Sequence, residues 1–297
     1  MMLTSQGSVG SDRSCHTVAD VTIITVHFKS SEVIHRMLKS LPDGCSVVVV
    51  DNSQCDPFAL QSDRQNVQVL RNPENLGFGA ACNIGAKAAQ TEFIFFLNPD
   101  TELLSGAIDA LLSASSTYQT AAGFNPQLRD DRGRRIHKHG SVLLSNFRRT
   151  GQGEKKGDHE ILILSGSAIF VRKQVFFETG GFDENIFLYH EDDDLSLRLQ
   201  LHGKLMHIED AVVIHREGHS CQRTPESAAW KAYHMGRSRV YATRKHNLNF
   251  AFTKSLLFAF LGVLSPDMLF SKRKFSKRTS FLKGVWSARI DGGLQKR

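Results

Sequence analysis

The chain has 297 residues, of which 41% are hydrophobic and 23% charged, as in a globular protein with a sizeable core. Its net charge of +7 is uneven, because the region from Trp230 to the end carries +13 and the preceding region therefore carries −6. An acidic body with a basic tail argues against a nucleic-acid groove through the fold. It favours a tail that meets an anionic surface.

Cysteine usage and the first residues bear on the compartment. The five cysteines are scattered and none forms a CxxC pair, which argues against a disulfide framework or a zinc ribbon. Residues 1–20 are polar and rich in Ser and Gly, without the apolar core of a signal peptide, and predict a disordered lead-in. We therefore expect a protein of the reducing cytoplasm.

The first half of the chain alternates apolar runs with helical patterns. Buried strands are predicted at 21–26, 47–50, 67–70 and 93–97, and helices at 31–41 and 80–89. The order strand, helix, strand, strand, helix, strand is typical of a doubly wound α/β sheet, which binds ligands beyond the carboxyl ends of its strands. Asp51, Asn75 and Asp100 each follow such a strand, so we expect them on one rim.

Each of these rim residues also has a structural interpretation. Asp51 can accept hydrogen bonds from a base or ribose, or it can cap the turn 51–53. Asn75 precedes Gly77 and Gly79, which allow close approach to phosphate at a helix start, although this pattern alone is weak. Asp100 suits Mg²⁺ or Mn²⁺ shared with a diphosphate, or it begins a helix over 103–112.

The second half is less regular. Residues 127–140 and 148–160 are rich in charge or glycine and predict mobile surface loops. Apolar order returns at 161–164 and 168–171, on either side of Ser165-Gly166-Ser167. A strand at 211–214 ends in His215, which is either a structural histidine or a residue that reaches the same rim as Asp100.

The segment 181–195 holds six carboxylates, and residues 191–194 are four of them in succession. A helical pattern follows and ends at Gly203. One or two acids at a helix start need no function, because the helix dipole favours them. Four in succession repel one another and raise the pKa of the least solvated. We therefore favour a carboxylate that accepts a proton from a substrate.

Taken together, these motifs resemble the inverting glycosyltransferases of family two, which have a GT-A fold, and specifically their bacterial rhamnosyltransferase-like branch. The resemblance covers about Val21 to Ser220. Its pieces are the first strand, Val49 to Ser53, Asn75 to Gly85, Phe96 to Asp100, Gly166 to Ala168 with Arg172-Lys173, Gly180 to Glu184, Glu191 to Leu195 with Arg198, and Val213 to His215.

The resemblance implies a role for each matching residue. Asp192 is the expected general base, with Glu191 as its rival, and the acids at 191, 193 and 194 are expected to keep it basic. Asp100 and His215 are the expected metal ligands, with Mg²⁺ or Mn²⁺ as cofactor. The expected donor-binding residues are Thr25, Val26, His27, Asp51, Asn75, Gly77, Asn83, Asn98 and Asp100, and the acceptor-side residues are Gly166, Asp183 and Asp194.

Two positions depart from the family pattern. Asn98 stands where the family commonly has the first acid of Asp-x-Asp, which removes one anionic metal ligand. Val26-His27-Phe28 replaces the more usual Ser-Tyr-Asn after the first strand, so base selectivity at His27 is open.

The resemblance divides the chain into a lead-in (1–20), a GT-A domain (21–225) and a basic helical region (226–297). Within the GT-A domain, 21–125 is the nucleotide-sugar-binding half and 126–225 the acceptor and catalytic half. Residues 250–270 are apolar but interrupted by Lys254, Pro266 and Asp267, so a membrane span is not expected. With basic residues 272–278 beside it, the segment predicts either an amphipathic element on the inner membrane surface or a helical lid packed on the domain.

We expect a metal-dependent inverting glycosyltransferase, peripheral to the inner membrane, that extends a cell-surface glycan or lipid-linked oligosaccharide. The resemblance favours dTDP-rhamnose as donor, with UDP or GDP sugars as alternatives. A nucleotidyl or phosphoryl transferase would need more carboxylates or a phosphate-binding cation on the first strands. A catalytically silent nucleotide-sugar-binding protein is the alternative from another class, since one metal-site acid is missing.

Overall fold

The structure, a computed structural model, describes residues 16–54, 57–59, 64–138, 140–144, 155–216, 224–268 and 270–291. Its first half contains β1 (Val21–His27), α1 (Ser31–Ser40), β2 (Ser46–Asp51), β3 (Val67–Arg71), α2 (Phe78–Ala88) and β4 (Phe93–Leu97). The predicted order of four strands and two helices is confirmed. Of the predicted lead-in, residues 1–15 lie outside the described residues, and Val18–Asp20 form a short 3₁₀ helix, η1.

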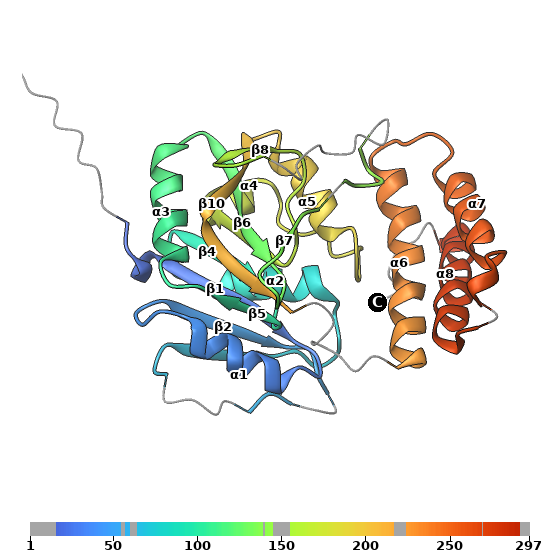
Figure 1. Cartoon of the computed structure of the whole chain (residues 1–297), viewed down its shortest axis with the longest axis horizontal. Coiled ribbons are helices and arrows are strands. Elements are labelled where there is room, and N and C mark those ends of the chain that lie inside the picture. The colour runs from blue at the N-terminus through green and yellow to red at the C-terminus, as the bar shows by residue number, and fades with distance from the viewer. Residues whose placement is uncertain are drawn as a thin grey trace, which may run out of the picture.

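A mixed sheet runs through the domain in the order β3-β2-β1-β4-β9-β6-β10-β5 (Figure 1). Its second half comprises β5 (Thr101–Leu103), α3 (Ala107–Thr117), β6 (Ala121–Arg129), β7 (Arg135–Ile136), β8 (His159–Ile161), β9 (Ala168–Arg172), α4 (Lys173–Glu178), α5 (Glu191–Leu199) and β10 (Lys204–His215). β3, β2, β1 and β4 are parallel, whereas β9 is antiparallel to both β4 and β6. The doubly wound mixed sheet is confirmed.

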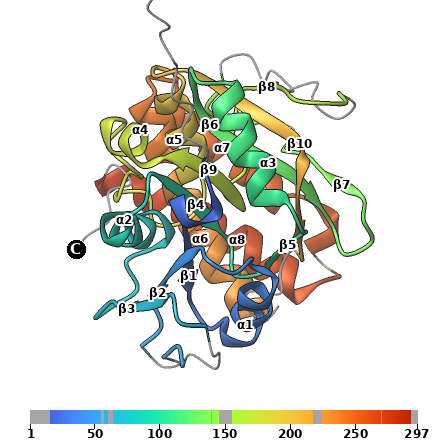
Figure 2. The ribbon, with the colours of Figure 1, turned by 90° about the vertical axis from the view of Figure 1, so that its left-hand side faces the viewer.

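Helices cover both faces of this sheet (Figure 2). On one face α1 and α3 pack through Met37 and Leu111, and on the other α2, α4 and α5 pack through Cys82, Phe176 and Leu195. All seven residues of β1 are buried, because alternate side chains enter the two cores. The buried strands at the centre of the sheet hold the carboxyl ends of the parallel strands at one edge of the sheet.

The prediction of surface loops at 127–140 and 148–160 is wrong in part. β6 continues to Arg129, and β7 and the edge strand β8 also fall in these segments. Polarity misled the prediction, because the polar Gln127 side chain is buried and its Nε2 donates a hydrogen bond to Glu209 O at 3.3 Å. Residues 139 and 145–154 lie outside the described residues.

Three helices follow the sheet domain: α6 (Pro225–Lys245), α7 (Ala251–Val263) and α8 (Lys272–Asp291), with the 3₁₀ helix η4 (Pro266–Met268) between the last two. α6 lies between the sheet domain and the α7–α8 pair (Figure 1). It packs closely on α8, since a Cβ at Gly284 would lie 2.0 Å from Tyr233 O. Among the described residues, the helices are too short or too polar to cross a membrane. The proposed domain boundaries stay a prediction.

Candidate active site

One cavity of about 510 Å³ opens where the carboxyl ends of the parallel strands meet segment 187–193 and α6. Eight of the residues predicted from sequence line it: Val26, Asn75, Gly77, Asn98, Gly166, Glu191, Asp192 and His215. Seven others do not belong to its described lining: Thr25, His27, Asp51, Asn83, Asp100, Asp183 and Asp194. The strand ends therefore converge with the acidic segment, as the sequence predicted, but only part of the predicted set reaches the cavity.

The turn before α2 presents backbone to this cavity. Gly77 has φ +88°, a conformation that disfavours a side chain, and a Cβ there would lie 2.3 Å from Phe187 O. Asn75 Oδ1 accepts a hydrogen bond from Gly77 N at 3.0 Å, and Asn52 Nδ2 donates to Gly77 O at 3.0 Å. Side-chain amides thus fix a turn that brings a helix N-terminus and segment 187–193 together.

Asp100 and His215 form a pair at the end of β10, where His215 lines the cavity. The antiparallel register of β5 and β10 places His215 opposite Thr101, so His215 Nε2 lies 3.3 Å from Asp100 Oδ1. Both residues are buried. Two ligand atoms on adjacent corners of an octahedral ion lie about 3 Å apart, so the pair fits two positions of one Mg²⁺ or Mn²⁺ shell. No third His, Cys, Asp or Glu in the described ranges joins them.

Asp192 is held at the start of α5 with its carboxylate in the cavity. Its Oδ2 accepts hydrogen bonds from Gly166 N at 2.8 Å and Lys138 Nζ at 2.6 Å, and its Oδ1 accepts from Asp193 N at 2.9 Å. A Cβ at Gly166 would lie 3.0 Å from Oδ2, so glycine there admits the carboxylate. The side chain is therefore fixed in one orientation toward the cavity.

The neighbouring acids differ from the all-negative cluster that the sequence predicted. Burial would raise the pKa of Asp193, but His190, 3.0 Å away, and the Lys138 ammonium hold that pKa below its ordinary value. For Glu191, burial first and the charge of Asp192 second raise the pKa to about 8. Glu191 is therefore protonated at neutral pH and adds no negative charge beside Asp192. The predicted electrostatic neighbourhood is corrected accordingly.

The buried Glu191 predicts a pH-dependent stability. Glu191 holds its proton up to about pH 8 in the folded state but only to about pH 4.5 in the unfolded chain. The bound proton therefore stabilises the fold at low pH. That stability is lost as pH rises through this window, by on the order of 4 kcal/mol. Replacing Glu191 with Gln should remove the loss, so the unfolding midpoint of the variant should rise relative to wild type between pH 5 and pH 8. If the thermal unfolding midpoints of wild type and variant change with pH in parallel, the prediction is contradicted.

Comparison with known proteins identifies the family. The sequence model of Glycosyl transferase family 2 matches residues 22–179, more than half of the chain. The chain belongs to this family. The matched residues run from β1 to just beyond α4, so α5 with Asp192, β10 with His215 and the three C-terminal helices follow the family domain in sequence.

Curated relatives and solved structures agree with this family 2 assignment. The chain is 29% identical over 262 residues to N-acetylglucosaminyl-diphospho-decaprenol L-rhamnosyltransferase of Mycobacterium tuberculosis, covering 76% of this chain and 84% of that protein. It is 26% identical over 253 residues to Rhamnosyltransferase WbbL of Escherichia coli, covering 77% and 95%. The predicted family and its rhamnosyltransferase-like branch are confirmed.

The fold is shared with more distant glycosyltransferases. A crystal structure of S. aureus TarS superposes with a TM-score of 0.52 at 14% identity, covering 91% of each chain. GalNAc-T7, solved with UDP, GalNAc and Mn²⁺, superposes with a TM-score of 0.55 at 16% identity, covering 91% of this chain and 56% of that one. The predicted GT-A fold is confirmed.

Three of the expected donor-binding residues of this family 2 domain form internal contacts instead. Asp51 accepts hydrogen bonds from Ser53 N at 2.9 Å and Phe58 N at 2.8 Å, which matches the turn-cap alternative. His27 is fully buried, with Nδ1 3.2 Å from Ser30 Oγ. Thr25 is also fully buried within β1. Their side chains shape the strand ends behind the cavity.

Asn83 likewise holds the fold. Its side chain donates to Phe182 O and accepts from Phe182 N, both at 2.9 Å, and so fixes α2 to the Gly180-Gly181 turn. Gly181 has φ +67°, and a Cβ there would lie 2.7 Å from Asn83 Oδ1. The predicted contact of Asn83 with the donor stays a prediction.

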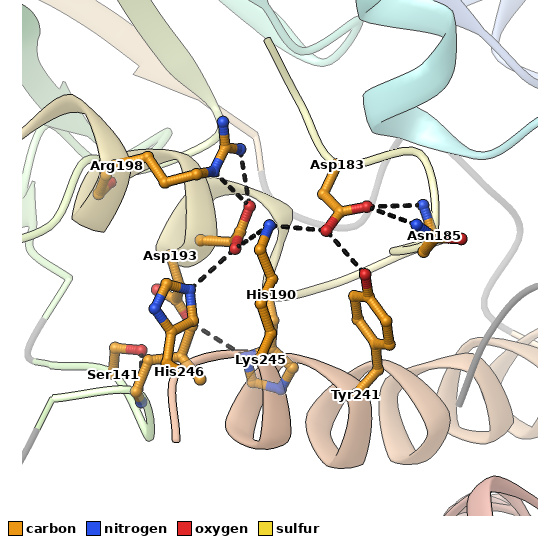
Figure 3. A network of polar contacts seen from close by, with 12 residues as sticks. Ser141, Asp183, Asn185, His190, Asp193, Arg198, Tyr241, Lys245 and His246 are labelled. Atoms are coloured by element: carbon orange, nitrogen blue, oxygen red, sulfur yellow. Dashed lines mark hydrogen bonds and ion pairs between the residues drawn. The ribbon is translucent and has the colours of Figure 1, made fainter. Parts of the chain in front are cut away.

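The two predicted acceptor-side acids, Asp183 (labelled in Figure 3) and Asp194, form polar contacts with residues at the C-terminal end of α6. Asp183 accepts hydrogen bonds from Tyr241 Oη at 3.0 Å and Lys245 Nζ at 2.6 Å. Asp194, fully buried, accepts from Lys245 Nζ at 2.7 Å and from Arg198, and lies 2.8 Å from His246 Nε2. Their carboxylates hold the C-terminal end of α6, and their predicted place on the acceptor side stays a prediction.

Sequence reasoning missed several residues of the cavity. Lys138 comes from a segment predicted as a loop, where its neighbours are as polar as it is and nothing distinguishes it. Trp230 and Lys231 line the cavity from α6, which follows the family domain. Phe28 stacks on Trp230 with ring centroids 5.7 Å apart, so α6 contributes an aromatic wall beside the end of β1.

Proposed function

We propose that this glycosyltransferase is a metal-dependent, inverting rhamnosyltransferase that transfers rhamnose from dTDP-rhamnose to a lipid-linked glycan acceptor. One observation carries the proposal: a single cavity is lined by Asp192, with its fixed carboxylate, and by His215, whose Nε2 lies 3.3 Å from Asp100 Oδ1. The two rhamnosyltransferase relatives, which match most of the chain, support the sugar, and the relative from Mycobacterium tuberculosis supports the lipid-linked acceptor.

In this proposal the chain uses a single displacement. The acceptor hydroxyl gives its proton to an Asp192 carboxylate oxygen while its oxygen bonds to the anomeric carbon of the donor. The bond from that carbon to the diphosphate breaks, and the electron pair leaves with the nucleoside diphosphate. Attack from the opposite side inverts the configuration at the anomeric carbon. Glu191 is the weaker candidate for the base, because it already carries a proton below about pH 8.

Asp100 and His215 would hold the metal, with the diphosphate completing its shell. Such an ion, when bound, neutralises charge that builds on the departing diphosphate. Asn98 lines the cavity beside this pair and can donate a hydrogen bond to a phosphate oxygen, which a carboxylate at that position cannot do. A neutral residue there leaves only one carboxylate for the metal, so a bound diphosphate should be needed for tight metal binding.

Replacing Asp100 with Asn is expected to abolish the effect of metal on nucleotide binding. Wild type should bind the nucleoside diphosphate more tightly with Mn²⁺ than with EDTA, as measured by calorimetry, because the ion links protein and phosphate oxygens. The variant should bind equally weakly in both. Asp131→Asn, a change to an exposed acid after β6, is the matched control. Persistent Mn²⁺ dependence in Asp100→Asn would remove Asp100 from the metal site.

Turnover of a donor panel tests the function as a whole. Nucleoside diphosphate release would be followed for dTDP-rhamnose and for UDP and GDP sugars, with and without Mn²⁺ or Mg²⁺, with bacterial lipid extract as acceptor. Metal-dependent release from dTDP-rhamnose alone supports the proposal. Release from another donor would change the sugar, and binding without release would favour a catalytically silent nucleotide-sugar-binding protein.

We also propose that α7 and α8 rest on an anionic membrane surface, where a lipid-linked acceptor resides. A groove of about 820 Å³ between these helices is lined mainly by apolar side chains, including Leu257, Phe260 and Trp286, which are all more than half exposed. Lys283 lines the groove, and Lys272, Arg273 and Lys277 lie on the first turns of the same helix α8. Apolar area flanked by Lys and Arg is the composition that binds anionic bilayers.

Reversing two of these charges, Arg273→Glu with Lys277→Glu, should weaken binding to phosphatidylglycerol vesicles. Each basic residue near such a surface contributes about 1 kcal/mol, so the affinity in co-sedimentation should fall more than tenfold. Reversal of Arg132 and Lys204, which are exposed on the sheet domain, is the matched control and should have little effect. Equal losses in both variants, or equal binding to neutral phosphatidylcholine vesicles, would contradict this surface.

A further inference from the structure

Lys138 lies in a polar segment of the sequence but contacts two acidic residues at the start of α5. Its Nζ lies 2.6 Å from Asp192 Oδ2, 2.7 Å from Asp193 Oδ1 and 3.1 Å from Leu164 O. The side chain is 23% exposed and lines the cavity. The Lys138 ammonium thus bridges Asp192, the expected base, and Asp193, and it donates a third hydrogen bond to the carbonyl oxygen of Leu164.

Electrostatics explain why a cation is needed here. Asp192 and Asp193 are consecutive carboxylates at a partly buried site, where like charges disfavour one another. Burial alone would lower the pKa of Lys138, but the charges of Asp192 and Asp193 raise it above its ordinary value. Lys138 therefore stays charged throughout the working pH range. Its charge favours the carboxylate form of the acids that it contacts.

We propose that Lys138 is a positioning residue that orients the Asp192 carboxylate for proton transfer and compensates its negative charge. The inference rests on the proposed function, in which Asp192 accepts the acceptor proton. When that proton arrives, Asp192 becomes neutral, and Asp193 remains as the anionic partner of Lys138. The bridge therefore compensates charge both before and after the transfer, without a buried cation being left unpaired.

Other charged groups face this bridge. Glu191 and His190 belong to the same segment as Asp192, and His190 lies 3.0 Å from Asp193 Oδ2. His215 and Lys231 line the cavity from β10 and α6. Among the described residues, none of these four forms a hydrogen bond or ion pair with the Asp192 carboxylate, so Lys138 is the cation whose removal should alter Asp192 most.

Kinetics of Lys138→Met and Lys138→Arg test the proposal. Loss of the cation should lower kcat by about 10²-fold, the usual range for disturbing a general base, while nucleotide-sugar affinity stays unchanged. Lys138→Arg keeps the charge and should retain most of the wild-type kcat. Lys204→Met, which removes an exposed lysine paired with Glu160, is the matched control.

A double-mutant cycle separates positioning from direct substrate binding. If Lys138 acts through Asp192, the Asp192→Asn/Lys138→Met variant should be no slower than Asp192→Asn. Additive losses, or a loss of nucleotide-sugar affinity in Lys138→Met, would show that Lys138 contacts a substrate phosphate and would overturn the proposal.

Thermal unfolding of the same four proteins gives a readout that needs no turnover. Destabilisation in the double variant should be less than the sum of the two single effects, because each single change leaves a charged partner behind. Strict additivity would overturn the pairing even if wild type turned over every donor. If the two changes are coupled in stability but wild type transfers no sugar from any donor, the Lys138–Asp192 pairing stands and the proposed function is refuted.

Discussion

Replacing Asp192 with Asn is expected to lower the rate of sugar transfer by about 10²–10⁴-fold, the contribution of a positioned general base. The amide has nearly the same shape, and its oxygen can still accept a hydrogen bond from Gly166 N or Asp193 N, but it cannot take a proton. Nucleotide-sugar affinity should stay unchanged, because the diphosphate is expected at the Asp100–His215 pair. Nucleoside diphosphate release in single turnovers, with calorimetry of donor binding, measures both quantities.

The neighbouring Glu191→Gln variant makes this experiment decisive. Glu191 is protonated below about pH 8, so an amide resembles its working form, and the variant should retain most of the wild-type rate at neutral pH. Above about pH 8 wild-type Glu191 ionises in a buried place beside Asp192, whereas the glutamine variant does not. Its alkaline limb should therefore extend further. If Glu191→Gln is inactive and Asp192→Asn is active, Glu191 is the base.

The strands and the family were predictable because their signals are local. Runs such as Val47–Val50 and Phe93–Leu97 are too apolar for anything but a sheet interior, and the glycine and aspartate motifs keep fixed spacing. Convergence of Asn75, Asn98 and His215 on one cavity followed from the parallel topology, which brings strand ends to one edge. Local patterns therefore sufficed for the fold and the position of the cavity.

Contacts between distant segments were not predictable in the same way. Lys138 is 54 residues from Asp192 in sequence, and only the pairing of β6, β7 and β10 brings its segment to the cavity. The polar Gln127 of β6 looked like a loop residue because its burial depends on a hydrogen bond to Glu209 O. Charge alone in a sequence does not tell whether a side chain meets solvent or a partner.

Motif membership also did not separate binding residues from anchoring ones. Asp192 and Asp194 are two residues apart in one acidic motif, but on a helix such a spacing points them in different directions. Asp192 reaches the cavity, and Asp194 turns inward to Arg198, Lys245 and His246. The family motif therefore includes two residues with different expected roles: Asp192 as the proton acceptor, and Asp194 as the residue that holds α6 beside it.

Replacing Asp194 with Ala is expected to destabilise the fold by about 3–5 kcal/mol, the usual effect of removing one partner of a buried ion pair. The side chain is fully buried, and its loss leaves Arg198 without its carboxylate partner and Lys245 with Asp183 alone. The unfolding midpoint should fall by about 10 °C in a chain of this size. Asp131→Asn, at an exposed acid after β6, is the matched control and should change the midpoint little.

The pH dependence of Asp194→Asn distinguishes an ion-pair effect from a packing effect. Burial would raise the pKa of Asp194, but the hydrogen bond with His246 and the charges of Arg198 and Lys245 lower it to about 2. Because the folded-state pKa lies below the ordinary value of 3.8, this stability is present above about pH 4 and is lost as pH falls through about pH 2. It amounts to about 2 kcal/mol.

Wild type should therefore exceed Asp194→Asn in unfolding free energy at neutral pH, and the difference should shrink in acid. A difference that does not change with pH would assign Asp194 to packing alone. The network holds the C-terminal end of the helix whose other end places Trp230 and Lys231 in the cavity wall. Loss of sugar transfer below the unfolding temperature of Asp194→Asn, with the sheet domain still folded, would mean that the cavity needs α6 held in place as well as Asp192.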